Sequence, residues 1–370
     1  MRLVEGDVEA FFAAPFEAYG RTSPYVSPMR SDIERFFDGA RNPLFAGGAP
    51  FAIFVAKDEG GRLRGRICAH IHPASNERYG ERRGCFGFFD CADDPEAARA
   101  LLGAAEAFAR NQGCDRLAGN FNLTAMQQIG VMTGGFENPA YTDMVWGPPH
   151  LPALLEANGF APTFPMTTFE IALDGPSDPV AALSPAARGL LGDRALEWAP
   201  IDRSRFDLRL EDARTVLNAA FDRNPMFVPV TAQEYRFQAQ EMMWILDPRL
   251  ACIVRAAGEP VGAVVCIPDL NPFMKASRSR YSLATPFHLI ADRLTRSRAV
   301  IIYYAVAPAW QGRGLNGAML ARVMRNARAA GYRSLGVTWI ADVNAASLRQ
   351  MERVGGRPLH RLHLFEKALT

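Results

Sequence analysis

The pattern of hydrophobic and polar residues in the first half of the chain predicts a strand meander followed by a long helix. Apolar runs at 51–56 and 65–72 flank a Gly-Gly turn, which is typical of a β-hairpin, and a phenylalanine-rich run at 83–90 predicts a third strand. Over 94–111 the apolar residues recur at helical spacing, and Asp94 stands where an N-cap is expected. The pattern therefore indicates a sheet covered by helices.

The second half repeats this order of elements. The pattern predicts two helices, a hairpin, then strand, helix, strand and helix, and lastly a closing hairpin or pair of strands, at 210–221, 231–245, 251–254 with 261–267, 299–306, 317–330, 334–340, 342–353 and 357–369. Residues 174–179 have the Gly, Pro, Ser and Asp content of a linker. We therefore expect two domains, residues 1–175 and residues 176–370.

An insertion at about 268–298 interrupts the second meander. Its large apolar residues stand among basic ones and are Phe273, Met274, Tyr281, Leu283, Phe287, Leu289, Ile290 and Leu294. Large apolar side chains such as these are expected to be buried against other apolar groups. The sequence leaves two alternatives, ordinary core packing or a lipid-accommodating groove or membrane-facing lip.

The charge, the apolar runs and the cysteines of the chain each bear on which classes of function are expected. The 370 residues carry a net charge of +2 with dispersed arginines, so no nucleic-acid partner is indicated. The start lacks a signal-peptide core, and no run of about 18 apolar residues is present. We expect a cytoplasmic protein, with peripheral contact to the inner membrane face as an option. The six cysteines form no C-x-x-C pair, and we expect buried thiols and no metal site.

The segment 306–317 joins a predicted strand to a predicted helix and is rich in glycine. Glycines at a helix N-terminus allow close backbone approach, and the free N–H groups and the helix dipole attract a phosphate. Arg313 adds a cation that can pair with a phosphate bidentately. The alternative is a left-handed turn before an ordinary surface helix. The spacing meets neither the G-x-x-x-x-G-K-[ST] loop nor the dinucleotide fingerprint.

This segment resembles the coenzyme A pyrophosphate loop of the GNAT acyltransferase superfamily, V-x-P-x-x-[QR]-x-x-G-x-[GA]. The matching residues are Val306, Pro308, Gln311 and Gly314. Asn316 departs from the pattern, because Gly or Ala is usual there, and Gly317 follows it.

The resemblance implies an α/β (α+β) fold class with two tandem GNAT-like domains, each a mixed, mostly antiparallel sheet flanked by helices. It implies an acyl-CoA co-substrate, an amine acceptor and acyl transfer between them. The residues that it implies for coenzyme A binding are Val306, Gln311, Gly312, Arg313, Gly314, Asn316, Gly317 and Asn344.

A further GNAT segment, N-x-x-[AS]-x-x-x-Y, aligns with Asn344 and Ser347, but Met351 stands in the place of its tyrosine. That tyrosine often protonates the leaving thiolate, so we expect that Tyr304 or a water does so here, or that the thiolate leaves unassisted. For the base we expect Glu234, directly or through water. The alternative is that Glu234 serves only as the N3 residue of a capping box.

The first half has no comparable loop. Asp90, Asp93 and Asp94 stand where a pyrophosphate would need donors and positive charge. Repulsion between such charges amounts to about a few kcal/mol per pair. We therefore expect residues 1–175 not to bind coenzyme A.

Some details resemble the ceramide-synthase-like acyltransferases of bacteria. They are Glu234 in its helix, the turn at 268–271, the apolar insertion and the segment 339–344. This implies a fatty acyl donor and a long-chain, sphingoid-type amine as acceptor. Two alternatives are an acetyl-CoA N-acetyltransferase of a small amine or protein N-terminus, and a catalytically silent module that binds acyl-CoA. The acceptor, the acyl chain length and the oligomeric state are left open.

Overall fold

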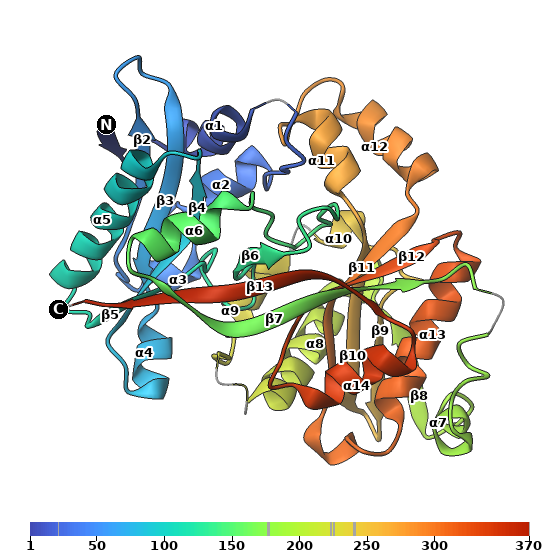
Figure 1. Cartoon of the computed structure of the whole chain (residues 1–370). Coiled ribbons are helices and arrows are strands. Elements are labelled where there is room, and N and C mark those ends of the chain that lie inside the picture. Colours follow the sequence, from blue (N-terminus) through green and yellow to red (C-terminus); the bar gives the residue numbers. More distant parts are fainter. Residues whose placement is uncertain (21, 176–177, 223, 225, 240–241, 370) are drawn as a thin grey trace. The chain divides into compact units, whose positions relative to one another are not determined.

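The computed structural model describes residues 1–370 except 21, 176–177, 223, 225, 240–241 and 370 (Figure 1). The chain divides into two compact units. Unit 1 comprises Met1–Thr167, Asn271–Leu289 and Leu359–Thr370, and unit 2 comprises Thr168–Leu270 and Ile290–Pro358. Residues 176 and 177 of the predicted linker lie outside the described part of the chain. The domain boundary at 175 stays a prediction.

Unit 1 is built on the predicted meander. Its main elements are β1 (Arg2–Glu5), α1 (Val8–Tyr19), α2 (Arg30–Phe36), α3 (Pro43–Ala46), β2 (Phe51–Lys57), β3 (Leu63–Ile71), α4 (Pro73–Tyr79), β4 (Arg83–Cys91), α5 (Pro95–Asn111), β5 (Arg116–Gly119), β6 (Val131–Gly134), α6 (His150–Ala157) and the first part of β7 (Ala161–Ala172). Strands β1 to β4 pair in antiparallel order, and β4 and β5 run parallel. The predicted strands and the α5 helix with its Asp94 cap are confirmed.

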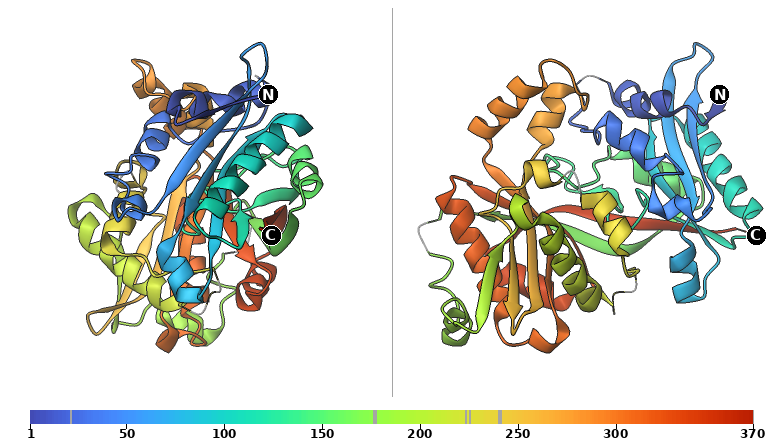
Figure 2. Two further views of the ribbon diagram at one scale, coloured as in Figure 1. Left: turned by 90° about the vertical axis from the view of Figure 1, so that its left-hand side faces the viewer. Right: turned by 180° about the vertical axis from the view of Figure 1, so that it is seen from behind.

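Helices cover both faces of this sheet, because successive residues of a strand point in opposite directions. In β3, Ile67 packs into the core beneath α5 and α6, and the next residue, Cys68, packs into the core of α1, α2 and α3. Figure 2 shows the strands of unit 1 between α5 and the N-terminal helices. All six cysteines of the chain are buried and unpaired.

Part of the insertion belongs to unit 1. It comprises α11 (Asn271–Ser277) and the beginning of α12 (Thr285–Thr295). Ser279 Oγ donates to the carbonyl of Ser27 at 2.7 Å, and the Arg30 N–H donates to the carbonyl of Ser279 at 2.8 Å. Arg280 pairs with Glu9. These contacts anchor the insertion on the first helices of the chain, a link that residue spacing did not indicate.

Unit 2 follows the predicted order. Its main elements are α7 (Pro185–Leu190), β8 (Leu196–Pro200), α8 (Phe206–Phe221), α9 (Ala232–Ala239), α10 (Met242–Ile245), β9 (Cys252–Ala256), β10 (Glu259–Pro268), β11 (Arg298–Val306), α13 (Leu315–Ala329), β12 (Ser334–Ala341) and α14 (Ala345–Arg353). The closing segment is one strand, β13 (Arg357–Ala368), so the predicted hairpin or strand pair is wrong. None of the described helices combines the length and apolar character needed to cross a bilayer.

The sheet of unit 2 is mostly antiparallel and is also covered on both faces. Met319 of α13 and Met351 of α14 pack with Val264 and Ile301 in one core, and Tyr304 packs against it. The adjacent Tyr303 points to the other face, where its ring lies 6.2 Å from that of Tyr235 in α9. The mixed, mostly antiparallel sheet flanked by helices is therefore confirmed.

Candidate functional site

Strands β11 and β12 of unit 2 run parallel and then separate. Their paired residues extend from Arg298↔Ser334 to Ile301↔Val337, although β11 continues to Val306. The register between β10 and β11 shifts at the same level, so that Ile302 bulges between two paired residues. Beyond these pairs the Thr338 hydroxyl donates to the Ile302 carbonyl at 3.3 Å, and the backbone pairing of the two strands ends.

A glycine-rich loop follows at the open end of β11. Gly312 and Gly314 have φ of 75° and 86°, which glycine adopts without strain. The Gln311 side-chain amide donates to the Val306 carbonyl at 3.0 Å and so fixes the entry to the loop. The exposed Arg313 guanidinium lies 5.0 Å from the ring centroid of Trp310, which is a cation–π contact.

The loop ends at an uncapped helix N-terminus. Gly314 is the N-cap of the 15-residue helix α13, and no side chain caps it. The first N–H groups of a helix have no partner within the helix, and the dipole adds positive potential at this end. With Arg313 beside it, this end of α13 suits a phosphate or diphosphate. The structure thus brings together most of the predicted loop residues, from Val306 to Gly317.

Tyr304 belongs to a ring of hydrogen bonds that ties three elements together. Its hydroxyl donates to the backbone carbonyl of Asn316 and accepts from the Gln350 amide at 3.0 Å. The Asn316 side chain in turn donates to the Gln350 carbonyl oxygen. Burial raises the pKa of Tyr304 well above its usual value, so the phenol keeps its proton. Gln350 was missed in the sequence because nothing in the pattern joined it to Tyr304.

This ring accounts for the departure of Asn316 from the family pattern. A Gly or Ala at this position has no side-chain amide with which to reach Gln350. Met351, the next residue, is buried in the core of unit 2, which leaves the usual position of the tyrosine filled by an apolar side chain. Tyr304 therefore supplies a phenol that is hydrogen-bonded to the start of α13 and to α14.

Glu234 and Asn344 both act as helix caps. Glu234 Oε2 accepts from the N–H and the hydroxyl of Thr231 at 2.8 and 2.7 Å, and Thr231 Oγ1 accepts from the Glu234 N–H at 3.2 Å. The capping box predicted as the alternative is therefore present. The Asn344 side chain accepts from the Ser347 N–H at 3.2 Å and caps α14.

Helix α7 packs against the glycine-rich loop, which the sequence did not indicate. A Cβ built on Gly314 would lie 2.9 Å from the Cβ of Ala187, and one on Gly317 would lie 3.4 Å from Leu183. Asp178 forms an ion pair with Arg325 of α13 at 2.9 Å. The segment 178–187 thus packs against the glycine-rich loop and helix α13.

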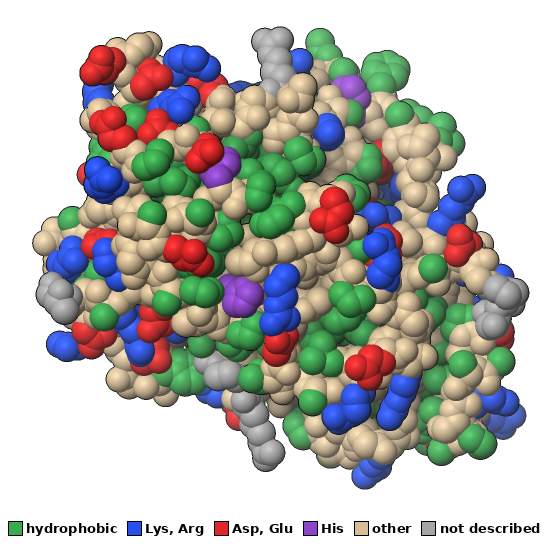
Figure 3. All heavy atoms as spheres, viewed as in Figure 1, with side chains coloured by type: hydrophobic (Ala, Val, Ile, Leu, Met, Phe, Trp, Pro, Cys, Tyr) green, Lys and Arg blue, Asp and Glu red, His purple; other side chains and the backbone are tan. Residues whose placement is uncertain are grey.

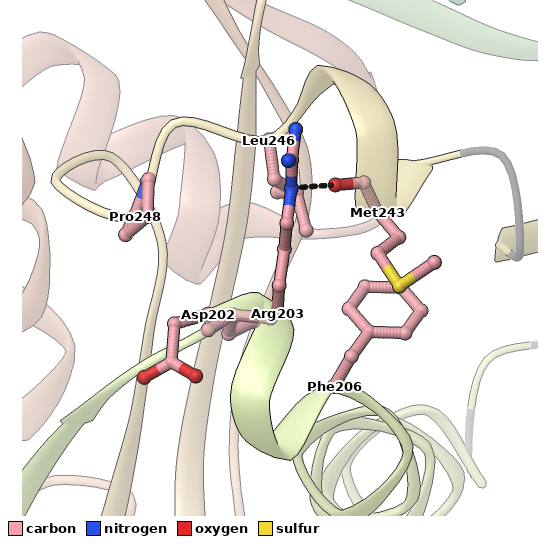
Figure 4. A pocket seen from close by; sticks show the side chains of 7 residues that line it. Asp202, Arg203, Phe206, Met243, Leu246 and Pro248 are labelled. Atoms are coloured by element: carbon pink, nitrogen blue, oxygen red, sulfur yellow. Dashed lines mark hydrogen bonds between the residues drawn. The ribbon is translucent and has the colours of Figure 1, made fainter.

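A cavity of about 370 Å³ opens at the start of α8 (Figure 4). Arg203 donates to the carbonyl of Met243 at 3.2 Å, and Asp202 accepts from the Ser204 N–H at 2.9 Å. Both charged side chains therefore have hydrogen-bond partners within the protein. The side chains of Phe206 and Met243 lie close together at its wall. None of the residues predicted for the acyl-CoA site lines this cavity.

The corresponding opening in unit 1 is filled by the chain itself. Strands β4 and β5 pair only as far as Phe86↔Gly119. Beyond that point, the Phe88 N–H donates to Asn122 Oδ1 at 2.7 Å and the Phe89 N–H donates to Asn120 Oδ1 at 3.1 Å. Both asparagines are buried, and the backbone of 119–122 occupies the space between the strands.

A carboxylate already occupies the N-terminus of α5, the helix that follows β4, so this end does not suit a bound anion. Asp94 accepts from the N–H groups of Glu96 and Ala97 at 3.0 and 3.1 Å, so a carboxylate already caps α5. Arg64 pairs with Asp94 at 3.1 Å, and Arg66 pairs with the buried Asp90 at 2.8 Å. The predicted acidic cluster thus caps a helix and neutralises buried arginine in unit 1.

Comparisons with known proteins agree with this geometry. Residues 214–355 match the family described as Acetyltransferase (GNAT) family. The chain is 26% identical over 396 residues to Protein YghO of Escherichia coli (strain K12), covering 99% of this chain and 94% of that protein. It is 27% identical over 375 residues to a bacterial ceramide synthase of Caulobacter vibrioides, covering 98% of this chain and 95% of the relative.

Among solved structures, the fold is similar to that of a tandem GNAT protein from the clavulanic acid biosynthesis pathway. The TM-score is 0.56 at 15% identity, covering 100% of this chain and 99% of the other. The predicted tandem GNAT fold is therefore confirmed. Within the described residues, no group of three or more His, Cys, Asp or Glu is arranged to hold a metal ion.

Proposed function

We propose that this chain, which its GNAT family match at 214–355 places among the acyltransferases, transfers an acyl group from coenzyme A to the amine of a long-chain, sphingoid-type base. The observation that carries the donor assignment is the combination of separated β11 and β12 strands with an uncapped, glycine-rich N-terminus of α13. An extended pantetheine arm fits the open strand edge, and its diphosphate fits the helix end.

In this proposal each residue of the loop has a role. The N–H groups from Gly312 to Gly317 and the Arg313 guanidinium bind the diphosphate. Gln311 and Val306 hold the loop entry through their hydrogen bond. Asn316 keeps the start of α13 attached to α14 through Gln350, and Asn344 presents the N-terminus of α14 toward the coenzyme.

The reaction forms one C–N bond and breaks one C–S bond. The neutral amine attacks the thioester carbonyl, and a backbone N–H of β11 beyond the bulge stabilises the oxyanion. Collapse of the tetrahedral intermediate releases coenzyme A as a thiolate. One proton leaves the amine nitrogen and one reaches the sulfur, so the products are an amide and the free thiol.

We propose Glu234 as the group that accepts the amine proton, directly or through water. Glu234→Gln separates this role from capping, because glutamine also closes a capping box. If Glu234 is the base, kcat/KM falls by about 100-fold or more, with the unfolding temperature unchanged. Steady-state kinetics across pH provide the measurement.

The matched control for Glu234 is Thr231→Ala. It removes the cap but keeps the carboxylate, so it should lower the free energy of unfolding by about 1 kcal/mol and leave the rate near that of the parent protein. A Glu234→Gln rate equal to the parent rate at every pH would show that Glu234 only caps the helix.

We propose Tyr304 as the donor of the thiolate proton. This requires its hydroxyl to turn from the Asn316 carbonyl toward the sulfur during the reaction. Tyr304→Phe should lower kcat by about 100-fold with a coenzyme A thioester. The loss should shrink with a thioester of an acidic aryl thiol, which leaves without a proton. An equal loss with both donors would indicate a structural role instead.

The acceptor assignment rests on the full-length similarity to a bacterial ceramide synthase. It is tested by coenzyme A release across an amine panel that includes sphingoid bases, with acetyl- and palmitoyl-CoA as donors and mass spectrometry of the amide. Turnover only with acetyl-CoA and small amines or a peptide N-terminus favours an acetyltransferase.

Buried Met351 in place of tyrosine keeps a silent acyl-CoA-binding module as a second candidate. That candidate predicts saturable binding of acyl-CoA with no thiol release for any amine in the panel.

A further inference from the structure

Helix α12 presents its apolar face to solvent. Three large apolar residues of this helix, and the leucine that precedes it, are highly exposed. The exposed fractions are 98% for Leu283, 73% for Phe287, 57% for Ile290 and 81% for Leu294. Figure 3 shows hydrophobic side chains standing out over this helix. We call these four residues the α12 patch.

The inward side of the same helix carries an acidic side chain. Asp292 is the residue of α12 that is buried, with its Oδ1 among the buried atoms that lack a hydrogen-bond partner in the described structure. A helix that packs on a protein core normally shows the opposite arrangement, with the apolar stripe inside. The α12 patch is therefore not explained by core packing, and single exposed leucines do not account for a contiguous set.

The segment that contains the α12 patch is rich in basic residues. The basic residues between 271 and 297 are Lys275, Arg278, Arg280, Arg293 and Arg296, and Asp292 is the acidic one. Lys275, Arg278 and Arg293 are exposed. Helices that lie in a membrane interface combine an apolar face with flanking Lys and Arg, and anionic lipid headgroups attract such cations.

The segment is also held in place. Ser279 is buried, and its hydroxyl and carbonyl bond to Ser27 and Arg30. Arg280 lies 4.7 Å from the ring centroid of Phe12. The chain leading into α12 is therefore fixed on the first helices, so the α12 patch is presented without the cost of ordering a loose loop.

We propose that α12 is an interfacial docking helix that inserts the α12 patch into an anionic lipid bilayer, with Lys275, Arg278 and Arg293 at the headgroups. The segment is complementary to an anionic bilayer in both respects, because it exposes large apolar side chains and basic ones. It is distinct from the glycine-rich loop and does not depend on the proposed reaction.

The test is flotation of the full chain with vesicles. Vesicles of equimolar phosphatidylglycerol and phosphatidylcholine should carry the protein, and pure phosphatidylcholine vesicles should carry much less. Leu283→Ser with Phe287→Ser should weaken binding by about tenfold for each side chain removed. Lys275→Glu with Arg293→Glu should weaken it by about fivefold per charge, with a smaller salt dependence.

The matched control is Leu208→Ser, which removes a half-exposed leucine from α8 and should leave vesicle binding unchanged. Leu283→Cys gives a second measurement, because the six native cysteines are buried and a thiol probe would label the new site. The emission of an environment-sensitive dye there should shift to the blue with anionic vesicles.

Failure of the parent protein to float with anionic vesicles would overturn the proposal, as would undiminished binding by the double serine variant. Self-association that the serine variant abolishes, without vesicle binding, would assign the patch to a second copy of the chain and overturn it too. Thiol release from acyl-CoA with a water-soluble amine is measured in parallel, so a failure of docking is distinguished from a failure of the proposed reaction.

Discussion

Replacing Gly314 with alanine is expected to raise the KM for acyl-CoA by about 30-fold, which corresponds to about 2 kcal/mol of lost anion binding at a helix N-terminus. The φ of Gly314 is +86°, and an added Cβ would lie 2.9 Å from the Cβ of Ala187. The backbone must therefore move at the point where α13 begins. Because the N–H groups that would bind the diphosphate follow this residue directly, a small rotation misdirects several donors together.

Gly331→Ala is the matched control for this prediction. Gly331 follows the other end of α13, has a φ of +91° and has no atom within 4 Å of an added Cβ. Both alanines carry a left-handed strain of about 1–2 kcal/mol, so both variants should lose thermal stability, and Gly314→Ala should lose more because its Cβ also clashes with Ala187. Only Gly314→Ala should change KM. An equal KM in both variants would remove the diphosphate assignment, and Arg313→Ala would then show no effect either.

Gly87→Ala is expected to destabilise unit 1 by about 4 kcal/mol or more, a range reached when a substitution forces backbone to move in a core. An added Cβ would lie 1.8 Å from the Phe121 carbonyl oxygen. The alanine therefore displaces 119–122, which fills the opening between β4 and β5. It also separates Asn120 and Asn122 from the N–H groups of Phe89 and Phe88, and each unsatisfied buried group costs about 1–3 kcal/mol.

Gly103→Ala is the control, since Gly103 lies in α5 and an added Cβ has no neighbour within 4 Å. It should stabilise the helix by up to about 1 kcal/mol. Thermal unfolding of both variants decides the comparison. If Gly87→Ala unfolds at the same temperature as the parent protein, residues 119–122 do not occupy the opening in unit 1.

The same filling supports our proposal that the first half does not bind coenzyme A. The asparagine carboxamides accept hydrogen bonds from β4 where an amide of pantetheine would, and Asp94 caps the helix where a diphosphate would bind. Calorimetry should therefore give one acyl-CoA per chain. A stoichiometry of two would contradict this proposal without affecting the site in unit 2.

The sequence by itself determined most of the helices and strands and the glycine-rich loop, because both depend on interactions between residues that are close together in the sequence. Hydrophobic periodicity located most strands and helices of both halves, although it predicted a hairpin or strand pair where β13 is one strand. A capping box requires only residues three apart. The glycines of 312–317 were recognisable because left-handed backbone angles at a helix start favour glycine over other residues.

Only the tertiary structure decided which distant residues meet. Gln350 joins Tyr304 to Asn316 across 46 and 34 positions, α7 supports Gly314 from upstream, and residues 119–122 fill unit 1. The exposed side of α12 was likewise undecided, since an amphipathic pattern gives a helix two unlike faces without saying which one is covered. Such contacts depend on how packed elements meet, and residue order fixes local hydrogen bonding but not the partner of each face.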